Sequence, residues 1–458
     1  MSLSEEIINE GPLFITKRLR QASFVSFAAV AFTTQPVNAG GFLLEHQNAI
    51  AMGRAFAGAE AVFEDVAFIA YNPASLAGAR GQGSITVTGI ILDSGYQNAN
   101  GQLSGINPID GRSSGDTALA DGIVPNLTIG GRLINDLSIG LVVNTPFGLR
   151  SNYANDSIFR YQAQESDLIT IEATPTLAYQ VTDSVSIGAG LRIQYLDLGL
   201  SSIIDAGGAA SAFGINGFGP QTSDASAVFD GDNVDIGYTV GVLFKFTEQI
   251  DVGIAYDSAI DHSIEGAVAF DLSASAAGQL LNSTFGLLGA TDFTTDFALP
   301  ASLAIGATID LGRPSLFFSA KRTFWSVFDV VELELDGITP NEVLTQNWTN
   351  SWQVSAGAEY IVADGLTGRL GVMWDQSPVN AGFASPRIPD SDRVWLSAGV
   401  SREFNDRAAF DLGVAYAFFE DREFALDGSL PENLFRGSAS GQLETSAVAI
   451  SGTFRYKF

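Results

Sequence analysis

The side chains that usually perform catalysis or hold metal ions are scarce in this sequence of 458 residues. Cysteine is absent, which excludes a thiol nucleophile, a disulfide framework, a zinc–thiolate site and an iron–sulfur cluster. The two histidines, His46 and His262, lie far apart in the chain, and we interpret each as a polar surface residue. We therefore expect no enzymatic activity, no metal site and no cofactor.

Three cations could bind an anionic group inside the protein: Arg192, Lys245 and Lys321. Each lies on the polar phase of a segment in which polar and apolar residues alternate. A carboxylate that is removed from water needs a cation or several hydrogen-bond donors. The three residues are therefore candidate partners of a carboxylate ligand. The alternative is that each pairs with an acidic residue in a water-filled interior.

The composition excludes some classes of protein and favours others. The formal net charge is −28, which argues against a nucleic-acid partner because phosphate binding requires clustered lysine and arginine. Hydrophobic residues make up 46% of the chain and charged residues only 16%, as expected for a membrane protein. The longest apolar run, 22–32, is about half of the ~20 residues that a spanning helix needs. Since only helices and closed barrels cross lipid, the chain is either a large soluble β-protein or a membrane barrel.

The N-terminus has the pattern of an export signal. Lys17, Arg18 and Arg20 precede the apolar run, and a small-residue cleavage site ends at Ala39. We expect residues 1–39 to be a signal peptide that is removed, so that the protein leaves the cytoplasm. The alternative is a buried helix.

From position 83 to the C-terminus, short segments alternate apolar residues with small or polar ones. In 236–246, for example, isoleucine, tyrosine and valine at every second position alternate with glycine and threonine. One apolar and one polar face is typical of a barrel whose outside meets lipid and whose lumen is polar. The fourteen expected strands are 83–93, 123–134, 136–147, 168–181, 184–202, 233–246, 250–270, 296–310, 314–331, 350–362, 366–376, 391–404, 407–421 and 440–458.

The connections between these strands alternate between tight turns and long loops. Turn-forming residues such as Asn135-Asp136 make the short connections, whereas the long ones reach about thirty residues. Short turns on one side, long loops on the other and an even number of strands describe a bacterial outer-membrane barrel. The sequence thus predicts an all-β protein in which 83–458 forms a transmembrane antiparallel β-barrel of about 14 strands.

Two of the long loops carry apolar residues. In 272–288 the near-helical spacing of Leu280, Leu281, Phe285 and others predicts a short amphipathic helix outside the membrane. The loop 203–219 is rich in glycine and alanine and also contains phenylalanine. Either these residues pack the loops together, or they form an exposed apolar surface that collects a hydrophobic ligand.

Residues 40–82 do not alternate as a strand does, and a compact segment of this size could lie in the lumen as a plug. The segment resembles the mature N-terminus of the FadL-type long-chain fatty acid transporters of the bacterial outer membrane. The matching residues are Gly41-Phe42, Gly53-Arg54-Ala55, Gly58 and Asn72-Pro73-Ala74, together with Asp375-Gln376-Ser377-Pro378-Val379, Arg387, Ile388-Pro389-Asp390 and Asp392-Arg393-Val394-Trp395. The resemblance covers the chain from 40 to 458.

The resemblance implies a fourteen-strand barrel with an N-terminal hatch, here 40–82. It implies that a ligand first lands between the loops 203–232 and 271–295, near Leu280, Leu281 and Phe285. The ligand then enters a tighter apolar site beside Phe42 and Leu44, and a shift of the N-terminus around Gly41 releases it. Exit is implied through the barrel wall at a kink in the third strand near Pro146, close to Asn72, Pro73 and Ala74. The alternative role of the two prolines is ordinary turn formation.

The sequence thus predicts passive uptake of hydrophobic compounds, most simply long-chain fatty acids, across the outer membrane of a Gram-negative bacterium. The expected partners are hydrophobic small molecules and outer-membrane lipid, and we expect a monomer. Uptake of aromatic hydrocarbons by the same route, a general porin, and an adhesin or structural barrel remain as alternatives. We interpret Asp375, Asp392 and Arg393 as a polar cluster that orders a loop.

Overall fold

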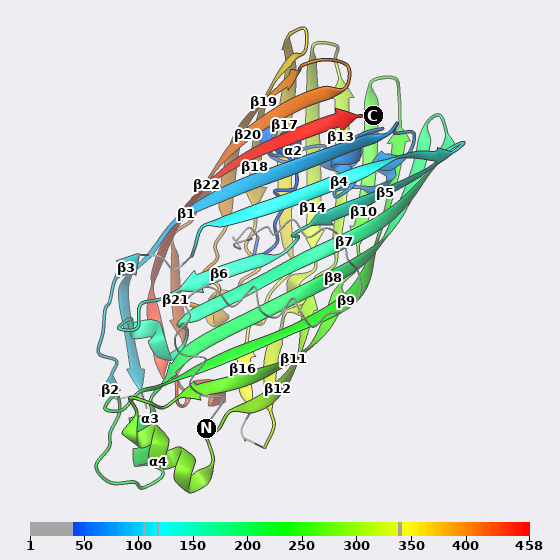
Figure 1. Cartoon of the computed structure of the whole chain (residues 1–458). Helices are drawn as coiled ribbons and strands as arrows, with labels where there is room; N and C mark the ends of the chain where they lie inside the picture. The colour runs from blue at the N-terminus through cyan, green and yellow to red at the C-terminus, as the bar shows by residue number, and fades with distance from the viewer. Residues whose placement is uncertain (1–39, 104–106, 117–118, 338–340) are drawn as a thin grey trace. The chain divides into compact units, whose positions relative to one another are not determined.

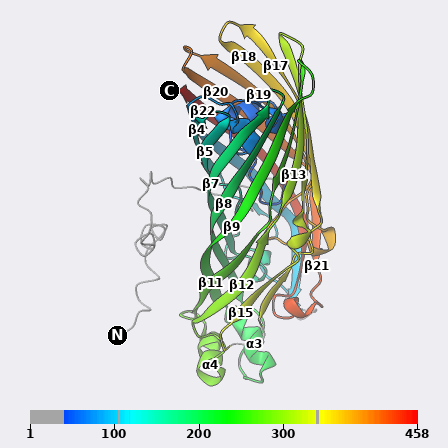
Figure 2. The same cartoon turned by 90° about the vertical axis from the view of Figure 1, so that its right-hand side faces the viewer.

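In the computed structural model, the residues described are 40–458 except for 104–106, 117–118 and 338–340. They belong to one compact unit. The predicted signal peptide, 1–39, lies outside the described residues. The unit is a barrel of antiparallel strands that closes where β1 (Gln82–Leu103) pairs with β22 (Ser438–Lys457) (Figures 1 and 2).

Counted over the described residues, the barrel wall has fourteen strand positions, as predicted. Eight are continuous: β1, β4 (Gly122–Ile134), β7 (Glu165–Thr182), β8 (Val185–Ile204), β9 (Ala225–Lys245), β18 (Leu366–Asp375), β19 (Arg393–Glu403) and β22. The other six are each divided in two: β5 (Leu137–Asn144) and β6 (Gly148–Asn152), β10 (Ile250–Asp257) and β11 (Ile260–Asp271), β12 (Thr291–Leu299) and β13 (Ser302–Asp310), β14 (Pro314–Thr323) and β15 (Val330–Leu335), β16 (Glu342–Thr345) and β17 (Ser351–Ala363), β20 (Ala408–Phe419) and β21 (Arg422–Leu426). The two-residue strands β2 (Asn107–Pro108) and β3 (Gly115–Asp116) pair with β1.

The alternation of side chains explains why these segments form a membrane barrel. On β9, Ile236 and Tyr238 are 63% and 52% exposed, whereas Gly241 on the other face is buried. Apolar side chains therefore cover the outer face, and small or polar ones face the lumen. Every helix among the described residues is too short or too polar to span a bilayer.

The strands extend further toward the long loops than the sequence predicts. β1 continues to Leu103 instead of ending at 93, and β9 begins at Ala225 instead of 233. These extensions contain polar residues and glycines that obscure the alternation, but their backbone groups pair with a neighbouring strand. The predicted loops 94–122 and 203–232 are correspondingly shorter.

The long-loop end carries two helices, α3 (Ala206–Ala212) and α4 (Ala276–Phe285). The helix predicted within 272–288 is confirmed, whereas α3 was not predicted. The two helices pack against each other at the end of the barrel opposite the C-terminus (Figures 1 and 2).

Residues 40–81 precede the barrel and are almost entirely buried. They include α2 (Ala49–Gly53) and the 3-10 helices η1 (Ala59–Ala61), η2 (Val66–Phe68) and η3 (Pro73–Leu76). α2 contacts β19 and β20, η1 contacts β10 and β13, and η3 contacts β8 and β9. Because these strands lie around the ring, the N-terminal segment occupies the interior of the barrel near the C-terminal end (Figure 2).

Candidate functional site

Phe42 is fully buried among five aromatic side chains. Its ring centroid lies 4.8 Å from that of Trp325 and 5.5 Å from that of Phe328, and the other rings are those of Phe147, Phe297 and Trp348. Four of the five rings belong to residues in the breaks that divide a strand position into two strands. The fifth, Phe297, lies near the end of β12, just before such a break. The interruptions of the wall therefore turn aromatic side chains onto the N-terminal segment.

The backbone next to Phe42 fills the break between β5 and β6. The Leu44 N–H donates to the Pro146 carbonyl at 2.8 Å, and the Gly148 N–H donates to the Phe42 carbonyl at 2.9 Å. Leu43 and Phe147 form an antiparallel bridge between these two bonds. Since proline has no N–H, it interrupts the ladder of the third strand position. The wall is thus interrupted at 145–147, where the family resemblance implies a kink, and the N-terminal segment pairs with this interruption, which is called the kink below.

A buried ion cluster holds the first residues of the segment. The Gly40 N–H donates to Asp375 at 3.2 Å, and the Gly41 N–H donates to Asp390 at 3.1 Å. Both carboxylates pair with Arg393, at 2.9 and 3.0 Å, and the three side chains are fully buried. Of the predicted cluster of Asp375, Asp392 and Arg393, the first and last pair as expected, and Asp390 takes the place of Asp392, which instead accepts a hydrogen bond from the Ser377 N–H within the loop. The cluster therefore contacts the N-terminus as well as the loop 376–392.

Asn72 joins the N-terminal segment to the barrel wall. Its side-chain amide donates to the Glu60 carbonyl at 2.7 Å and to the Val242 carbonyl at 3.2 Å, and its oxygen caps η3 at the Ala74 N–H. A methyl group at Gly241 on β9 would overlap the Asn72 side chain. Glycine is therefore required there for Asn72-Pro73-Ala74 to approach the wall.

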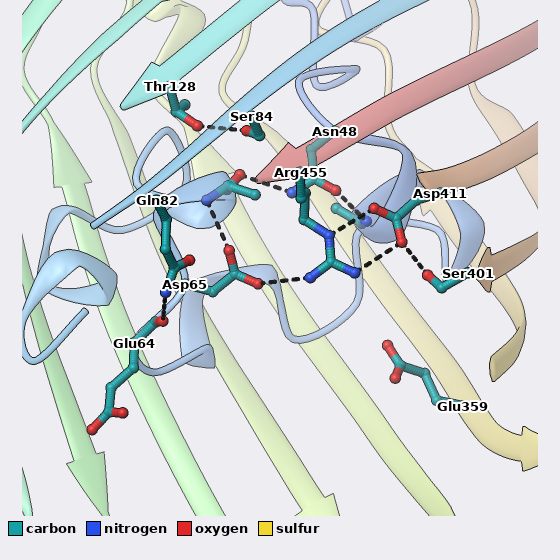
Figure 3. A network of polar contacts seen from close by, with 12 residues as sticks. Asn48, Glu64, Asp65, Gln82, Ser84, Thr128, Glu359, Ser401, Asp411 and Arg455 are labelled. Carbon is teal, nitrogen blue, oxygen red and sulfur yellow. Dashed lines mark hydrogen bonds and ion pairs between the residues drawn. The ribbon is translucent and has the colours of Figure 1, made fainter. Parts of the chain in front are cut away.

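Arg455 of β22 adds an electrostatic contact on another side of the segment. Its guanidinium lies 3.5 Å from Asp65 in the N-terminal segment and 2.7 Å from Asp411 on β20 (Figure 3). Asp65 also accepts a hydrogen bond from the Ala67 N–H at 2.9 Å, which caps η2. The segment is therefore bound to the wall by polar contacts at several separate strands.

A polar cavity lies between the N-terminal segment and the kink. Leu44 and Pro146 line it together with Arg192 and Lys321. Arg192 pairs with Glu172 at 2.9 Å, and Lys321 pairs with Glu45 at 2.5 Å. Two of the three predicted cations thus lie in one cavity, but both are neutralised by carboxylates, as the alternative interpretation predicts.

A second cavity, bordered by Phe42, is almost entirely apolar. Its apolar lining consists of Phe42, Leu149, Leu168, Leu198, Leu200, Phe297, Phe328, Val331, Leu344 and Ile388. Its polar lining consists of Ser166, Asp167, Gln346 and Arg387. Arg387 lies in the stretch that carries the family resemblance but was not among the predicted site residues.

The two loop helices carry an exposed apolar patch. Phe213, just after α3, and Phe285 of α4 are 49% and 47% exposed, and their ring centroids lie 5.3 Å apart. Leu280 is also exposed, whereas Leu281 is buried between the helices. Of the predicted loop residues, Leu280 and Phe285 are therefore accessible to a ligand, and Leu281 packs the helices together.

The family described as "Outer membrane protein transport protein (OMPP1/FadL/TodX)" matches residues 30–458. The chain belongs to this family. Relatives include a long-chain fatty acid transport protein of Escherichia coli O6:H1 (strain CFT073), 25% identical, with 96% of this chain and 99% of the relative covered. Outer membrane protein P1 of Haemophilus influenzae is 26% identical, with 83% of this chain and 86% of the relative covered.

Solved structures agree with this assignment. A Pseudomonas aeruginosa FadL homologue superimposes with a TM-score of 0.84 at 25% identity, covering 91% of this chain and all of the homologue. The Ralstonia pickettii toluene transporter TbuX has a TM-score of 0.63 at 18% identity, covering 90% of this chain and 99% of TbuX, and shares the fold. As a member of the OMPP1/FadL/TodX family, this protein is an outer-membrane transporter of hydrophobic compounds and not an enzyme.

The remaining candidate residues of this family member lie away from both cavities. Lys245 is exposed at the end of β9, where its ammonium lies 4.9 Å from the ring of Phe63, and it lines neither cavity. His46 and His262 are both buried, so their interpretation as surface residues is wrong. Burial lowers the pKa of His46, which packs beside Trp395, to about 3 and keeps it neutral. His262 contacts Gln194 and Asn233 in the wall.

Proposed function

We propose that this transporter takes up long-chain fatty acids by binding them in the apolar cavity beside Phe42 and releasing them sideways at the kink in the wall. The observation that carries the proposal is the double role of Phe42. Its ring lines the apolar cavity, while its carbonyl accepts a hydrogen bond from Gly148 at the kink. A ligand that displaces the ring therefore also disturbs the pairing at the kink.

The first step is capture at the loop helices. Phe213, Leu280 and Phe285 form an apolar patch at the long-loop end of the barrel, which is the extracellular side in this architecture. Exposed apolar patches bind hydrophobic molecules. The patch therefore raises the local concentration of a sparingly soluble acid before it enters the barrel.

Tight binding in the apolar cavity must be reversible. Burying one methylene is worth about 0.8 kcal/mol, so a chain of about sixteen carbons gains up to roughly 12 kcal/mol before its ordering costs. Such a ligand would leave slowly from a rigid site. Movement of Phe42 removes part of the cavity wall, and this movement weakens binding at the moment of release.

The contacts of the N-terminal segment allow its first residues to move alone. Gly40–Leu44 depend on four backbone hydrogen bonds to the kink and to the buried carboxylates, in addition to the aromatic packing. The rest of the segment is held separately by Asn72 and Asp65. We therefore propose that 40–82 acts as a hatch, that only its end moves, and that removal of 1–39 as a signal peptide frees this end.

The exit is the interruption at 145–147, where the third strand position lacks a continuous ladder. A hydrophobic ligand that passes there enters lipid directly and does not need to cross an aqueous lumen. Because β1 pairs with β22, the barrel closes without a strand from a second subunit, so we propose that a monomer is sufficient. A general porin would need an open aqueous path, which the buried segment 40–81 obstructs.

Uptake of labelled oleate and labelled toluene tests the substrate. Both are offered to cells that have no other transporter of this kind, with and without this protein correctly assembled in the outer membrane. The proposal predicts that the protein accelerates oleate uptake. Acceleration of toluene alone would favour aromatic hydrocarbons by the same route, and acceleration of neither would contradict transport of both substrate classes.

A further inference from the structure

We propose that Arg387 is the residue that binds the carboxylate of the ligand in the apolar cavity. This inference rests on the proposed function and narrows it to acids with a long aliphatic tail. Arg387 lies in the loop between β18 and β19 and lines the cavity together with mostly apolar residues.

Arg387 is a buried cation that forms no salt bridge with a described residue. The nearby charges of Glu342 and Arg436, which pair with each other, act on it with opposite sign. Only 5% of Arg387 is exposed. One of its terminal nitrogens donates to the Glu165 carbonyl at 3.2 Å, the Ser166 hydroxyl at 3.3 Å and the Ser201 carbonyl at 3.2 Å. All three acceptors are neutral. Its Nε atom is completely buried and makes no hydrogen bond to a described residue.

An uncompensated buried charge is costly, and the cost falls when an opposite charge enters the same site. Burial lowers the pKa of Arg387 to about 10, so the guanidinium remains charged at neutral pH. An almost entirely apolar cavity is therefore bordered by a guanidinium that has no acidic hydrogen-bond partner and has one buried, unused donor. A carboxylate with an aliphatic tail complements all three features.

The other cations at the two cavities are already paired. Arg192 binds Glu172 and Lys321 binds Glu45, both in the polar cavity. The one acidic residue that lines the apolar cavity is Asp167, and its carboxylate lies 3.6 Å from Arg150. Among the described lining residues of both cavities, Arg387 is thus the cation that a new carboxylate can bind without displacing an existing partner.

The position of Arg387 also links the ligand to the N-terminus. Asp390, three residues further along the same loop, accepts the hydrogen bond from Gly41. The cavity has a volume of about 30 Å³, so a long tail whose head is bound at Arg387 must widen the space bordered by Phe42. The head group of the ligand therefore contacts the loop that carries Asp390, and the tail contacts Phe42. Both of these residues hold the start of the N-terminal segment in place.

Binding of oleate and of oleyl alcohol to the purified, detergent-solubilised protein tests the inference, because the two ligands share a tail and differ in charge. Arg387→Met should weaken oleate binding about ten- to a hundredfold, the range for loss of a charge-assisted hydrogen bond, and leave oleyl alcohol binding unchanged. Arg387→Lys should restore part of the oleate affinity. Lys245→Met is the matched control, since this exposed cation lines neither cavity, and should bind both ligands as the wild type does.

Three outcomes would overturn the inference. Unchanged oleate binding by Arg387→Met, in protein whose barrel is folded by circular dichroism, would show that the cation does not bind the head group. An equal loss of affinity for oleate and oleyl alcohol would show that Arg387 maintains the shape of the cavity and does not bind the carboxylate. If the wild type binds neither ligand, the proposed function itself fails, and this result is distinct from the first two.

Discussion

The backbone N–H of Leu44 donates a hydrogen bond to the carbonyl of Pro146 at 2.8 Å, which joins the start of the N-terminal segment to the interruption in the third strand position of the wall. Pro146 cannot donate to a ladder, so the wall itself leaves this place incomplete. The N-terminal residues complete it. Leu44 and Pro146 also line the polar cavity, so the proposed release route would link this cavity to the wall through two residues far apart in the sequence.

Phe42→Ala should release the first residues of the segment and leave the barrel intact. Loss of a buried phenylalanine ring costs about 3–5 kcal/mol, and here the cost falls on local packing of Gly40–Leu44 rather than on the strands. Amide hydrogen exchange at Leu44 should accelerate about a hundredfold or more. Phe285→Ala, which removes an exposed ring on α4, is the control and should leave this amide unchanged. Slow exchange at Leu44 in Phe42→Ala would mean that the ring does not hold the segment.

Glu60 should make the stability of the protein depend on pH. Burial raises the pKa of Glu60 from 4.5 to about 7, and the Ser319 hydroxyl hydrogen-bonds to it. Between pH 4.5 and 7 the folded protein binds more protons than the unfolded chain, so the free energy of unfolding rises as the pH falls through this window. The full effect is about 3 kcal/mol.

Thermal unfolding of detergent-solubilised protein at pH 5 and pH 7.5 measures this dependence. The wild type should unfold at a higher temperature at pH 5. Glu60→Gln, which keeps an acceptor for Ser319 and cannot ionise, should lose much of the difference. An identical pH dependence in both proteins would show that Glu60 is not the responsible group.

Gly241→Ala should loosen the N-terminal segment. The added methyl group overlaps the Asn72 side chain, so Asn72-Pro73-Ala74 must move away from β9. The ion conductance of single barrels in a planar bilayer should increase if the segment is the proposed hatch and obstructs the lumen. Gly89→Ala on β1 is the matched control, since a methyl group there meets no atom within 4 Å. Equal conductance of the two variants would argue against close packing as the seal.

The barrel could be predicted from the sequence because, along each strand, apolar residues that face lipid alternate with small or polar residues that face the lumen. Ile236 and Tyr238 face outward and Gly241 inward, and this alternation is visible within a few residues. The divided strands were not predicted, apart from the kink implied by the family resemblance. Their breaks place Trp325 and Trp348 on Phe42, a contact between distant parts of the chain.

The candidate site was predicted only in part for the same reason. Phe42 and Pro146 were identified through the family resemblance, and the structure brings them to the same kink. Arg192 and Lys321 were selected by their phase on a strand, but phase does not reveal that each has a carboxylate partner. Arg387 lies outside any strand, and its lack of an acidic partner follows only from the residues that fold around it.

A disulfide between the N-terminal segment and the kink tests most directly whether these two parts must separate for the ligand to leave. Leu43 and Phe147 are opposite each other in a non-hydrogen-bonded antiparallel pair, a geometry with Cα atoms about 4.5 Å apart that suits a disulfide. Because the sequence has no cysteine, the variant Leu43→Cys/Phe147→Cys contains a single possible bridge.

Oleate uptake should be measured in cells that carry this double variant, first oxidised and then reduced, with Leu43→Cys alone as the control. If release of the N-terminal residues from the kink opens the route, oxidation should stop uptake and reduction should restore it, while the single variant responds to neither. Equal uptake by the oxidised and reduced double variant, with the bridge verified by mass spectrometry, would contradict release of the ligand at the kink.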